Sequence, residues 1–381
     1  MYNGPYGSDE PYRGGSAASV VSGALAPAHK RARRGAVPAR RAGARIAGLT
    51  VSDSDSVLTQ AQVLERLGLA GDEWAEGIFA RCGVLRRHLN LEGEFLDRSL
   101  QDRTREVERE LLAHSIKAVD ALGVDPQEVG TVISASLYSL GVPTIAHRLV
   151  EHYRMDPTTD KYHLTGVACA SGVPLMRLAA QTLHEHPDKH TLVVAAESMS
   201  SILMRATPRD PKAKTVGSAI FGDGCAAALL SANPRAHGPA ILGSQVHQIG
   251  DTLGAVSLEI DGEDSYLHIA RELPDLASAG LPDVAGAFLR RHGLEHADID
   301  HWIVHPGGRR IVENVQSALE LSREDVATSW DTLAEHGNIG TPSIMYVLEN
   351  TIARRRPQPG ERALMVTIGP GVTVGMMLLG W

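Results

Sequence analysis

The sequence predicts an α/β fold built of layers. Short apolar runs rich in β-branched residues alternate with amphipathic stretches at helical spacing along most of the 381 residues. The second half repeats the order of elements in the first half, which suggests an internal duplication, although no residue-level repeat is visible. In both halves a chemically reactive residue follows a strand and precedes a helix, where α/β folds usually place ligand sites.

In the first half, 45–232, ordered sequence is expected to begin around Ala44. Val57–Leu69 has helical spacing with Ser56 as a candidate N-cap. Arg103–Leu122 predicts a long amphipathic helix closed by Gly123. The other expected elements are a buried strand at Val132–Tyr138, a helix at Pro143–Tyr153, a buried strand at Thr191–Ala196, and a turn with an apolar strand at Ala219–Ala232.

The second half, 233–381, shows the same rhythm of strands and helices. Helical spacing and apolar runs distinguish the two kinds of element. The expected elements are helices at Leu281–Gly293, Arg309–Leu321 and Thr341–Arg355, and strands at Ile299–Val304, Ala363–Ile368 and Val372–Leu379. The last two strands flank the turn Gly369-Pro370-Gly371.

Composition argues against several classes of function. The net charge of −8 disfavours nucleic acid as the main partner, and the longest apolar runs fall short of a membrane span. No CxxC or HExxH pairing indicates a metal site. The three cysteines, Cys82, Cys169 and Cys225, lack the spacing of a disulfide framework, so we expect a reducing, cytoplasmic setting.

Residues 1–44 are expected to form a basic tail apart from the fold. Tyr2–Gly23 is rich in Gly, Ser and Tyr, and Lys30–Arg45 is strongly basic. The stretch has no apolar core like that of a signal peptide. It is interpreted either as a disordered tail or as a docking arm for an acidic partner or polyanion.

The stretch His163–Leu183 centres on Cys169. Small residues surround the cysteine and an apolar run at helical spacing follows, which predicts a tight turn or strand leading into a helix. Unpaired N–H groups and the helix dipole at that position favour a nucleophilic thiolate. The alternative is an inert buried cysteine, which is the favoured interpretation for Cys82 and Cys225.

Two further segments can complete an active site with Cys169. His305 ends a predicted strand and precedes a glycine turn, where it could act as the base or cation that a cysteine nucleophile needs. Asn338 lies in a polar loop before a helix and could donate an amide N–H to a developing oxyanion. His336 is the alternative catalytic histidine, although its context favours it less than that of His305.

Four short motifs give these residues a family context. They are HPGG at His305–Gly308, GN at Gly337-Asn338, FGDG at Phe221–Gly224 and GPGVTV at Gly369–Val374. Together with the helix-borne Cys169 they resemble type III polyketide synthases, the chalcone synthase-like enzymes, over roughly Ile46–Trp381. FGDG and GN also occur across the wider thiolase superfamily, whereas HPGG combined with the terminal GPG is more specific.

The resemblance implies a thiolase-like αβαβα fold of two related halves, and a homodimer. It places a catalytic triad on Cys169, His305 and Asn338. Cys169 would take an acyl starter from coenzyme A, and His305 would hold its thiolate as an imidazolium ion pair. His305 and Asn338 would then stabilise the enolate left when malonyl-CoA loses CO₂. Iterative Claisen condensation and cyclisation would follow, with CoA thioesters as substrates and no metal or redox cofactor.

The resemblance also implies substrate-binding positions. Arg81, and more weakly Arg309, match basic residues near a CoA tunnel mouth, although a solvated surface arginine is the alternative. Two gatekeeping phenylalanines of the family fall on Leu203 or Met204 and on Leu267. The full set expected at the substrate is Arg81, Leu203, Met204, Leu267, Gly307, Gly308, Gly340 and Ile368. Gly340 replaces a serine and Ile368 an aromatic residue, so we expect a cavity for an aliphatic or bulky starter rather than a phenylpropanoid one.

Two other functions remain open. One is a ketosynthase III-like enzyme that condenses once with an acyl carrier protein or only transfers the acyl group; the HPGG motif argues against it. The other is a catalytically silent partner that binds acyl-CoA or another synthase. Retention of Cys169, His305 and Asn338 argues against that second function.

Overall fold

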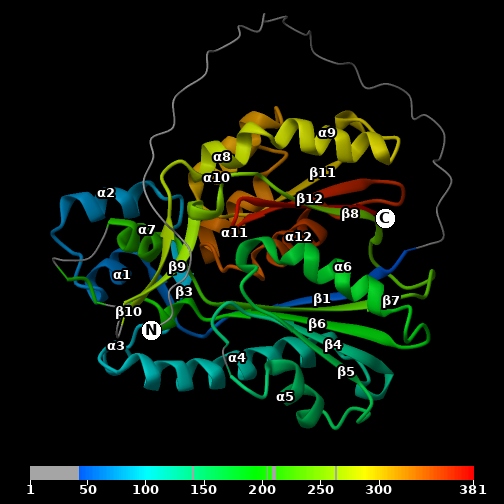
Figure 1. Ribbon diagram of the computed structural model, residues 1–381, viewed down its shortest axis with the longest axis horizontal. Helices are drawn as coiled ribbons and strands as arrows, with labels where there is room; N and C mark the ends of the chain where they lie inside the picture. The colour runs from blue at the N-terminus through cyan, green and yellow to red at the C-terminus, as the bar shows by residue number, and fades with distance from the viewer. Residues whose placement is uncertain (1–42, 140, 204, 208–211, 262–263) are drawn as a thin grey trace, which may run out of the picture. The chain divides into compact units, whose positions relative to one another are not determined.

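The computed structural model describes residues 43–381, apart from residues 140, 204, 208–211 and 262–263 (Figure 1). The expected basic tail, 1–44, lies almost wholly outside the described residues. Within the described ranges, no helix combines the length and the apolar character needed to cross a bilayer.

Nine strands form one mixed sheet in the order β11–β12–β13–β8–β1–β7–β6–β4–β5. Their bounds in that order are His301–Val304, Arg362–Gly369, Thr373–Gly380, Ala240–Gln248, Arg45–Ser52, Gly224–Ser231, His190–Glu197, Val129–Ala135 and Asp160–Leu164. Strands β8 and β1 pair in register only at Arg45 and Ala240. The sheet therefore consists of a four-stranded and a five-stranded part joined at one short contact.

Helices fill and flank these two parts of the sheet. Helices α6 (Gly172–Thr182) and α12 (Ser343–Arg355) lie between them (Figure 1). Helices α4 (Leu100–Leu122) and α5 (Ile145–His152) cover the outer face of the five-stranded part. Helices α8 (Leu273–Ala279), α9 (Leu281–Arg291) and α10 (Arg309–Ala318) cover the other outer face. This αβαβα layering confirms the predicted fold class.

The remaining elements gather beside the layers, at the end of the sheet where the cavity described below opens. They are β2 (Val57–Thr59), α1 (Gln60–Arg66), α2 (Glu73–Arg81), β3 (Arg86–His88), α3 (Gly93–Leu96), α7 (Lys212–Ile220), β9 (Val256–Asp261), β10 (Asp264–Ile269) and α11 (Ala327–His336). Strands β9 and β10 form an antiparallel hairpin, and α7 packs against β10.

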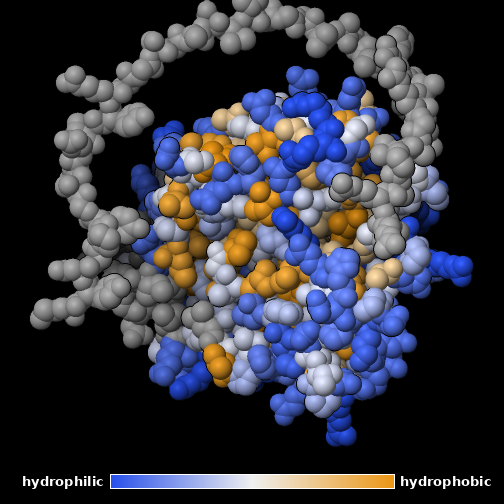
Figure 2. Space-filling model, turned by 45° about the vertical axis from the view of Figure 1, so that its right-hand side comes forward, coloured by the Kyte–Doolittle hydropathy of each residue, from blue (hydrophilic) through white to orange (hydrophobic). Residues whose placement is uncertain are grey.

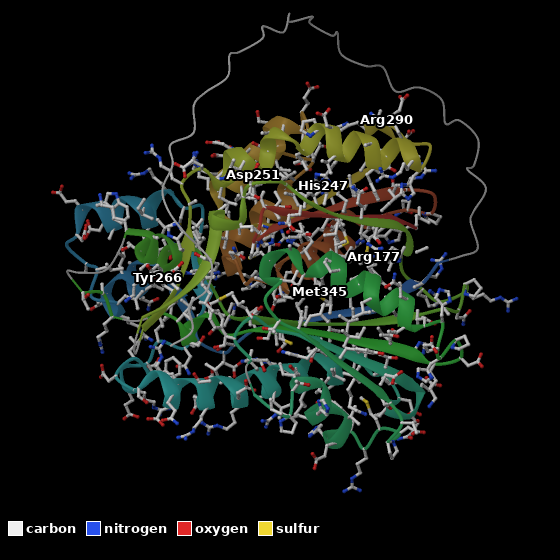
Figure 3. All side chains as sticks on the ribbon, in the orientation of Figure 1. Arg177, His247, Asp251, Tyr266, Arg290 and Met345 are labelled. Atoms are coloured by element: carbon white, nitrogen blue, oxygen red, sulfur yellow. The ribbon has the colours of Figure 1, made fainter. Side chains whose placement is uncertain are left out.

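The two central helices are buried on most of their surface. In α12 the side chains of Ile344, Met345 and Val347 have no exposed area, and Met345 lies in the middle layer (Figure 3). Helix α6 presents small residues to its partner: a side chain added at Gly172 would collide with Cγ2 of Ile344. The close approach of the two helices therefore requires glycine at the start of α6.

The first expected helix differs from the observed structure. Val57–Thr59 is a strand paired with Arg86–His88, and the helix runs only from Gln60 to Arg66. The N-cap is Thr59, whose hydroxyl accepts from the Gln62 N–H while the Gln62 side chain accepts from the Thr59 N–H. This capping box fixes the helix start three residues later than the expected cap at Ser56.

Gly172→Ala is expected to destabilise the protein because the added methyl group overpacks the contact with Ile344. Overpacking in a well-packed core costs about 1–3 kcal/mol. Urea unfolding followed by circular dichroism measures the loss. Gly93→Ala is the matched control: a Cβ there meets no atom within 4 Å, so its midpoint should stay unchanged or rise. Equal midpoints for wild type and Gly172→Ala would contradict this account of the helix contact.

Candidate active site

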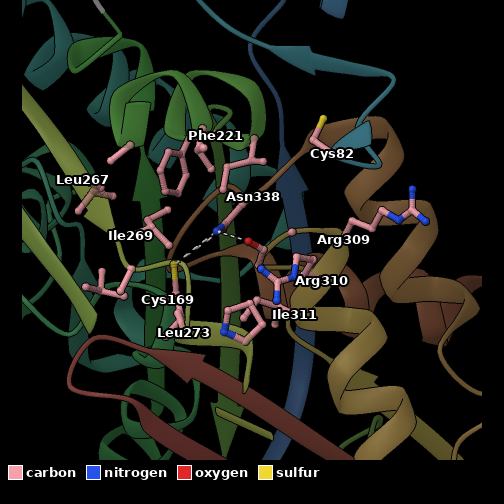
Figure 4. A pocket seen from close by; sticks show the side chains of 18 of the residues that line it. Cys82, Cys169, Phe221, Leu267, Ile269, Leu273, Arg309, Arg310, Ile311 and Asn338 are labelled. Atoms are coloured by element: carbon pink, nitrogen blue, oxygen red, sulfur yellow. Dashed lines mark hydrogen bonds between the residues drawn. The ribbon is translucent and has the colours of Figure 1, made fainter. Parts of the chain in front are cut away.

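A cavity of about 1060 Å³ lies where loops from the two parts of the sheet meet the small elements beside them. Cys169, His305 and Asn338, separated by more than thirty residues at the closest in sequence, all line it. Figure 4 shows Cys169 and Asn338 side by side at the cavity. Its walls are mostly aliphatic or aromatic, with contributions from α2, α7, the β9–β10 hairpin and α8. The apolar lining includes Trp74, Ile78, Val216, Ile220, Phe221, Val256, Leu267, Ile269, Leu273 and Ile368.

Cys169 lies in a single 3₁₀ turn, Ala168–Ala170, directly before α6. Ala168 has φ 45°, an uncommon conformation for a residue with a Cβ, and its carbonyl accepts from the Ser171 N–H at 2.8 Å. A side chain at Gly369 would collide with the backbone N of Ala170, so the glycine of the GPG motif lets the terminal turn press against the cysteine turn. The turn therefore projects the half-buried thiol into the cavity.

His305 directly follows β11. Its backbone N–H donates to the Val366 carbonyl of β12 at 2.9 Å, which continues the ladder between the two strands. Its Nδ1 is buried without a hydrogen-bond partner among the described residues. Gly307 lies against the ring, since a Cβ there would come within 3.1 Å of Nε2. The HPGG turn thus leaves the imidazole room at the cavity wall.

Asn338 follows α11 on the loop to α12, and its side-chain amide has a fixed orientation. Oδ1 accepts from the Gly340 N–H at 3.0 Å and from Ser343 Oγ at 3.3 Å. With Oδ1 held in this way, 3.8 Å from Cys169 Sγ, Nδ2 lies 3.7 Å from the same sulfur and 3.4 Å from the Gly307 carbonyl (Figure 4). The Asn338 N–H donates to the Ile220 carbonyl at 2.7 Å, which anchors the loop to α7.

Burial favours the neutral forms of both Cys169 and His305. It raises the pKa of the Cys169 thiol to about 12, while the Asn338 amide acts in the opposite direction and the Glu197 carboxylate adds to the rise. Burial lowers the pKa of His305 to about 3. Burial therefore favours a thiol and a neutral imidazole near pH 7, whereas the resemblance implies an imidazolium–thiolate pair, and the alkylation experiment below distinguishes the two.

Glu197 is a buried acid beside the site that sequence reasoning missed. It ends β6, and its carboxylate accepts from Thr341 Oγ1 at 2.7 Å and from the Leu137 N–H at 3.0 Å. Burial raises its pKa to about 7, against the opposing effect of these hydrogen bonds. A charged residue at the end of the otherwise apolar run Thr191–Ala196 was the available signal.

Five of the expected substrate positions line the cavity: Arg81, Leu267, Gly307, Gly308 and Ile368. Arg309 lines it as well. Leu203 does not; it is buried in the core, and its carbonyl accepts from Arg103 at 3.1 Å. Gly340 also lies outside the lining, because its Cα faces Met199 and Glu197. Met204 falls outside the described residues.

Basic side chains line part of the cavity. Arg309 pairs with Glu313 at 2.7 Å and Arg310 with Asp275 at 3.5 Å. Lys212 lies over the Trp74 ring, 5.2 Å from its centroid. Among the described residues no ion pair with a carboxylate involves Arg81, Lys212 or Arg271, so these three basic residues are better placed to bind a new anion than Arg309 and Arg310. Sequence reasoning found Arg81 and Arg309 but missed Lys212, Arg271 and Arg310.

Comparisons with known proteins show which family this chain is similar to. The family profile described as FAE1/Type III polyketide synthase-like protein matches residues 37–248, and that of the 3-oxoacyl-[acyl-carrier-protein] synthase III C-terminal domain matches residues 289–381. A 1,3,6,8-tetrahydroxynaphthalene synthase of Streptomyces peucetius is 30% identical over 268 residues, 69% of this chain and 70% of that protein. A 3,5-dihydroxyphenylacetyl-CoA synthase of Amycolatopsis balhimycina is 27% identical over 354 residues, 88% of this chain and 93% of that protein.

Solved structures share the fold. The 1,3,6,8-tetrahydroxynaphthalene synthase of Streptomyces coelicolor, a bacterial type III polyketide synthase, superposes with a TM-score of 0.81 at 24% identity. The match covers 89% of this chain and 99% of that one. PKS-I from the brown alga Ectocarpus siliculosus gives a TM-score of 0.80 at 23% identity, covering 90% of this chain and 100% of that one.

Alkylation of the free protein by iodoacetamide is expected to modify Cys169 alone and to accelerate up to alkaline pH. Cys225 is buried. Cys82 lines the same cavity but is only 9% exposed, and its thiol donates to the Phe79 carbonyl at 3.1 Å, so Cys169 is the more accessible thiol. With a thiol pKa of about 12, the thiolate fraction rises about tenfold per pH unit between pH 7 and 9. Mass spectrometry of the labelled peptide gives the rate, and Cys169→Ala is the control. A rate that levels off below pH 8 would show a preformed ion pair with His305 instead.

Proposed function

The chain belongs to the FAE1/type III polyketide synthase-like family, and from this membership we propose that it builds a polyketide from CoA thioesters on Cys169. The enzyme is an acyltransferase that condenses acyl units with decarboxylation and releases a cyclised product. The observation that carries the proposal is the fixed Asn338 amide, whose Nδ2 faces Cys169 Sγ at 3.7 Å inside an apolar cavity.

Loading of the starter uses Cys169 and His305. The Cys169 sulfur attacks the thioester carbonyl carbon of an acyl-CoA, and its proton passes to the His305 imidazole. The bond between the acyl carbon and the CoA sulfur breaks, and CoA leaves with the proton returned from His305. The acyl group is then a thioester on Cys169. Because burial keeps His305 neutral, the ring can accept a proton during the attack without first losing one.

Extension uses Asn338 and His305 as donors to an oxyanion. When the carboxylate of malonyl-CoA leaves as CO₂, the electron pair of the broken C–C bond becomes an enolate whose charge rests on the thioester oxygen. The Asn338 Nδ2–H and the ring N–H of neutral His305 stabilise that oxygen. The enolate carbon attacks the Cys169 thioester, the Cys169 sulfur leaves, and the lengthened chain is carried on CoA. Repetition and ring closure complete the product.

CoA thioesters supply the reactive carbon and the leaving group, so this sequence of steps calls on no metal or redox cofactor. The phosphates of CoA carry negative charge, which the basic residues lining the cavity would bind. Arg81, Lys212 and Arg271 are the proposed contacts, because Arg309 and Arg310 already pair with carboxylates.

The lining supports an aliphatic or bulky starter. Leu267, Ile269 and Ile368 form walls with branched aliphatic side chains, and Phe221 is the phenylalanine among the lining residues. Such walls make dispersion contacts with alkyl chains but offer no hydroxyl partner for a phenolic starter. The proposed starter is therefore a medium or branched acyl-CoA, with malonyl-CoA as extender.

We also propose a homodimer and a cytoplasmic location. Exposed apolar side chains support the dimer: Val142 is 91% exposed and Leu85 is 66% exposed. Figure 2 shows apolar patches among the charged residues of one face. Sedimentation of the full chain tests the assembly, with a monomer at micromolar concentration as the opposing result.

Asn338→Ala is expected to slow decarboxylation of malonyl-CoA about 10²–10³-fold, because one oxyanion donor is lost. Loading of a radiolabelled starter on Cys169 should persist. Release of labelled CO₂ and retention of label on the protein measure the two steps separately. Asn233→Ala, which changes an exposed turn whose Oδ1 accepts from the Arg235 N–H, is the control. Unchanged CO₂ release in Asn338→Ala would remove the amide from the mechanism.

Mass spectrometry of products with a panel of starters tests substrate class and iteration together. We expect kcat/KM for medium-chain acyl-CoAs to exceed that for coumaroyl-CoA by at least about tenfold, the scale set by fit to an apolar pocket. Leu267→Trp should lower kcat/KM for the longest alkyl starters, because the larger side chain fills part of the cavity. The control is Leu258→Trp, which changes the residue paired with Leu267 in the hairpin but outside the lining.

Three results of that panel would contradict the proposal. A strict preference for coumaroyl-CoA would reject the aliphatic starter. Products with one malonyl unit only would indicate a single-condensation enzyme of the ketosynthase III kind. Binding of acyl-CoA with no acylation of Cys169 would indicate a silent partner.

A further inference from the structure

A second group of reactive side chains lies outside the Cys169 cavity. Asp53 follows β1, His88 ends β3, and His336 ends α11. One donor atom from each lies within 4.8 Å of the other two, and none of the three residues lines the Cys169 cavity. We propose that Asp53, His88 and His336 bind a divalent transition-metal ion of the zinc class.

The hydrogen bond at His88 determines which ring nitrogen can act as a ligand. His88 Nδ1 lies 2.5 Å from the Ser54 carbonyl oxygen, which can only accept, so Nδ1 carries the proton. In the neutral ring Nε2 is therefore an acceptor, and it faces Asp53 Oδ2 at 3.8 Å. Two acceptors that face each other at this distance repel one another, and a positive charge between them removes that repulsion. A metal ion supplies that charge, and the Ser54 contact is the outer-shell bond typical of a ligating histidine.

His336 provides the third donor. Its Nδ1 lies 3.2 Å from Asp53 Oδ1, yet it is buried and has no hydrogen-bond partner among the described residues. A ring nitrogen that lies this close to a carboxylate oxygen without the geometry of a hydrogen bond is positioned as a ligand of a shared ion would be. His336 also ends α11, and the negative end of a helix dipole favours a cation.

The distances suit a small ion after slight rotation of the rings. Zinc takes nitrogen at about 2.0–2.1 Å and carboxylate oxygen at about 2.0–2.2 Å, which in a tetrahedron separates donors by roughly 3.3–3.5 Å. The two distances from Asp53, 3.2 and 3.8 Å, bracket that range, and the donor atoms of His88 and His336 lie within 4.8 Å of each other. Three protein ligands leave a fourth position for water. A small cavity of about 170 Å³ reaches the group at His336, one of its lining residues.

The surroundings hold the carboxylate in place. The Tyr346 hydroxyl lies 2.9 Å from Asp53 Oδ1 and 3.0 Å from the Ser52 carbonyl, both of which accept from it. The side chains of Asp53, His88 and His336 are 28%, 15% and 23% exposed. They are thus open enough for an ion to enter and sheltered enough to limit competition from water.

Occupancy would join three segments that are distant in sequence. The ion would tie the end of β1 to β3 and to the loop that carries Asn338, which lies two residues after His336. The chain already links these segments, since the Asp223 N–H donates to the His88 carbonyl at 2.8 Å and Asn338 forms a bridge with Phe221. The bound ion is therefore expected to reduce amide exchange in residues 336–340.

Titration of the full chain with zinc chloride in the presence of a competing chelator tests the site. We expect one saturable equivalent, and at least about 10–100-fold weaker binding in both His88→Gln and His336→Gln. The matched control is His186→Gln: His186 Nε2 lies 3.0 Å from Asp160 Oδ2, a histidine–carboxylate pair without a second imidazole. Its affinity should equal that of the wild type. Circular dichroism establishes that the variants are folded.

X-ray absorption of wild-type protein with one equivalent of zinc gives a second measurement that depends on no variant. The expected spectrum has a first shell of nitrogen and oxygen with the outer scattering of two imidazoles. A sulfur shell would place the ion at Cys169 and overturn the proposal. Absence of saturable binding, or unchanged affinity in both glutamine variants, would show that a proton rather than a metal lies between His88 and Asp53. None of these readouts depends on polyketide synthesis, so they remain decisive if that function fails its own tests.

Discussion

The arrangement of the site depends on the two hydrogen bonds that fix the Asn338 amide. Gly340 N–H and Ser343 Oγ both bond to Oδ1, so Nδ2 has only the cavity side left. The loop can make this arrangement because Gly337 and Gly340 adopt φ of 70° and 64°, which residues with a Cβ rarely adopt. A side chain at Gly337 would also collide with the Ile220 carbonyl, the acceptor that anchors Asn338. An amide free to rotate would offer its oxygen to an enolate half the time and repel it.

Burial of Cys169 and His305 in the cavity wall determines which protonation states these two side chains favour. Desolvation shifts the pKa of Cys169 upward and that of His305 downward, which favours a resting site without an ion pair. Charge then develops only when a thioester is present and water has been displaced. Preorganised dipoles act most strongly under those conditions, because little solvent remains to screen them. A resting thiol is also less exposed to oxidation than a thiolate would be.

The candidate catalytic residues could be predicted from short local motifs. Cys169, His305 and Asn338 each lie in short segments whose glycines and strand ends reveal a turn at a sheet edge, and all three line the cavity. The layered fold followed from the alternation of elements. Helix α11 gave no such signal, because Thr328, Ser329 and Thr332 contribute to its buried face beside Trp330 and Leu333, so apolar periodicity is weak. The start of α1 was misplaced because the capping box at Thr59 outweighed helical spacing.

The sequence alone could not predict which side chains line the cavity, because long-range packing decides this. Leu203 turns into the core and Gly340 lies against Met199 and Glu197, although the resemblance placed both at the substrate. Much of the apolar wall of the cavity comes instead from the β9–β10 hairpin, which contributes Val256, Leu267 and Ile269. That hairpin forms a sheet of its own and carries none of the three residues assigned to the chemistry. Substitutions in this one hairpin can therefore change which acyl groups the cavity accepts during evolution, while the residues assigned to the chemistry stay the same.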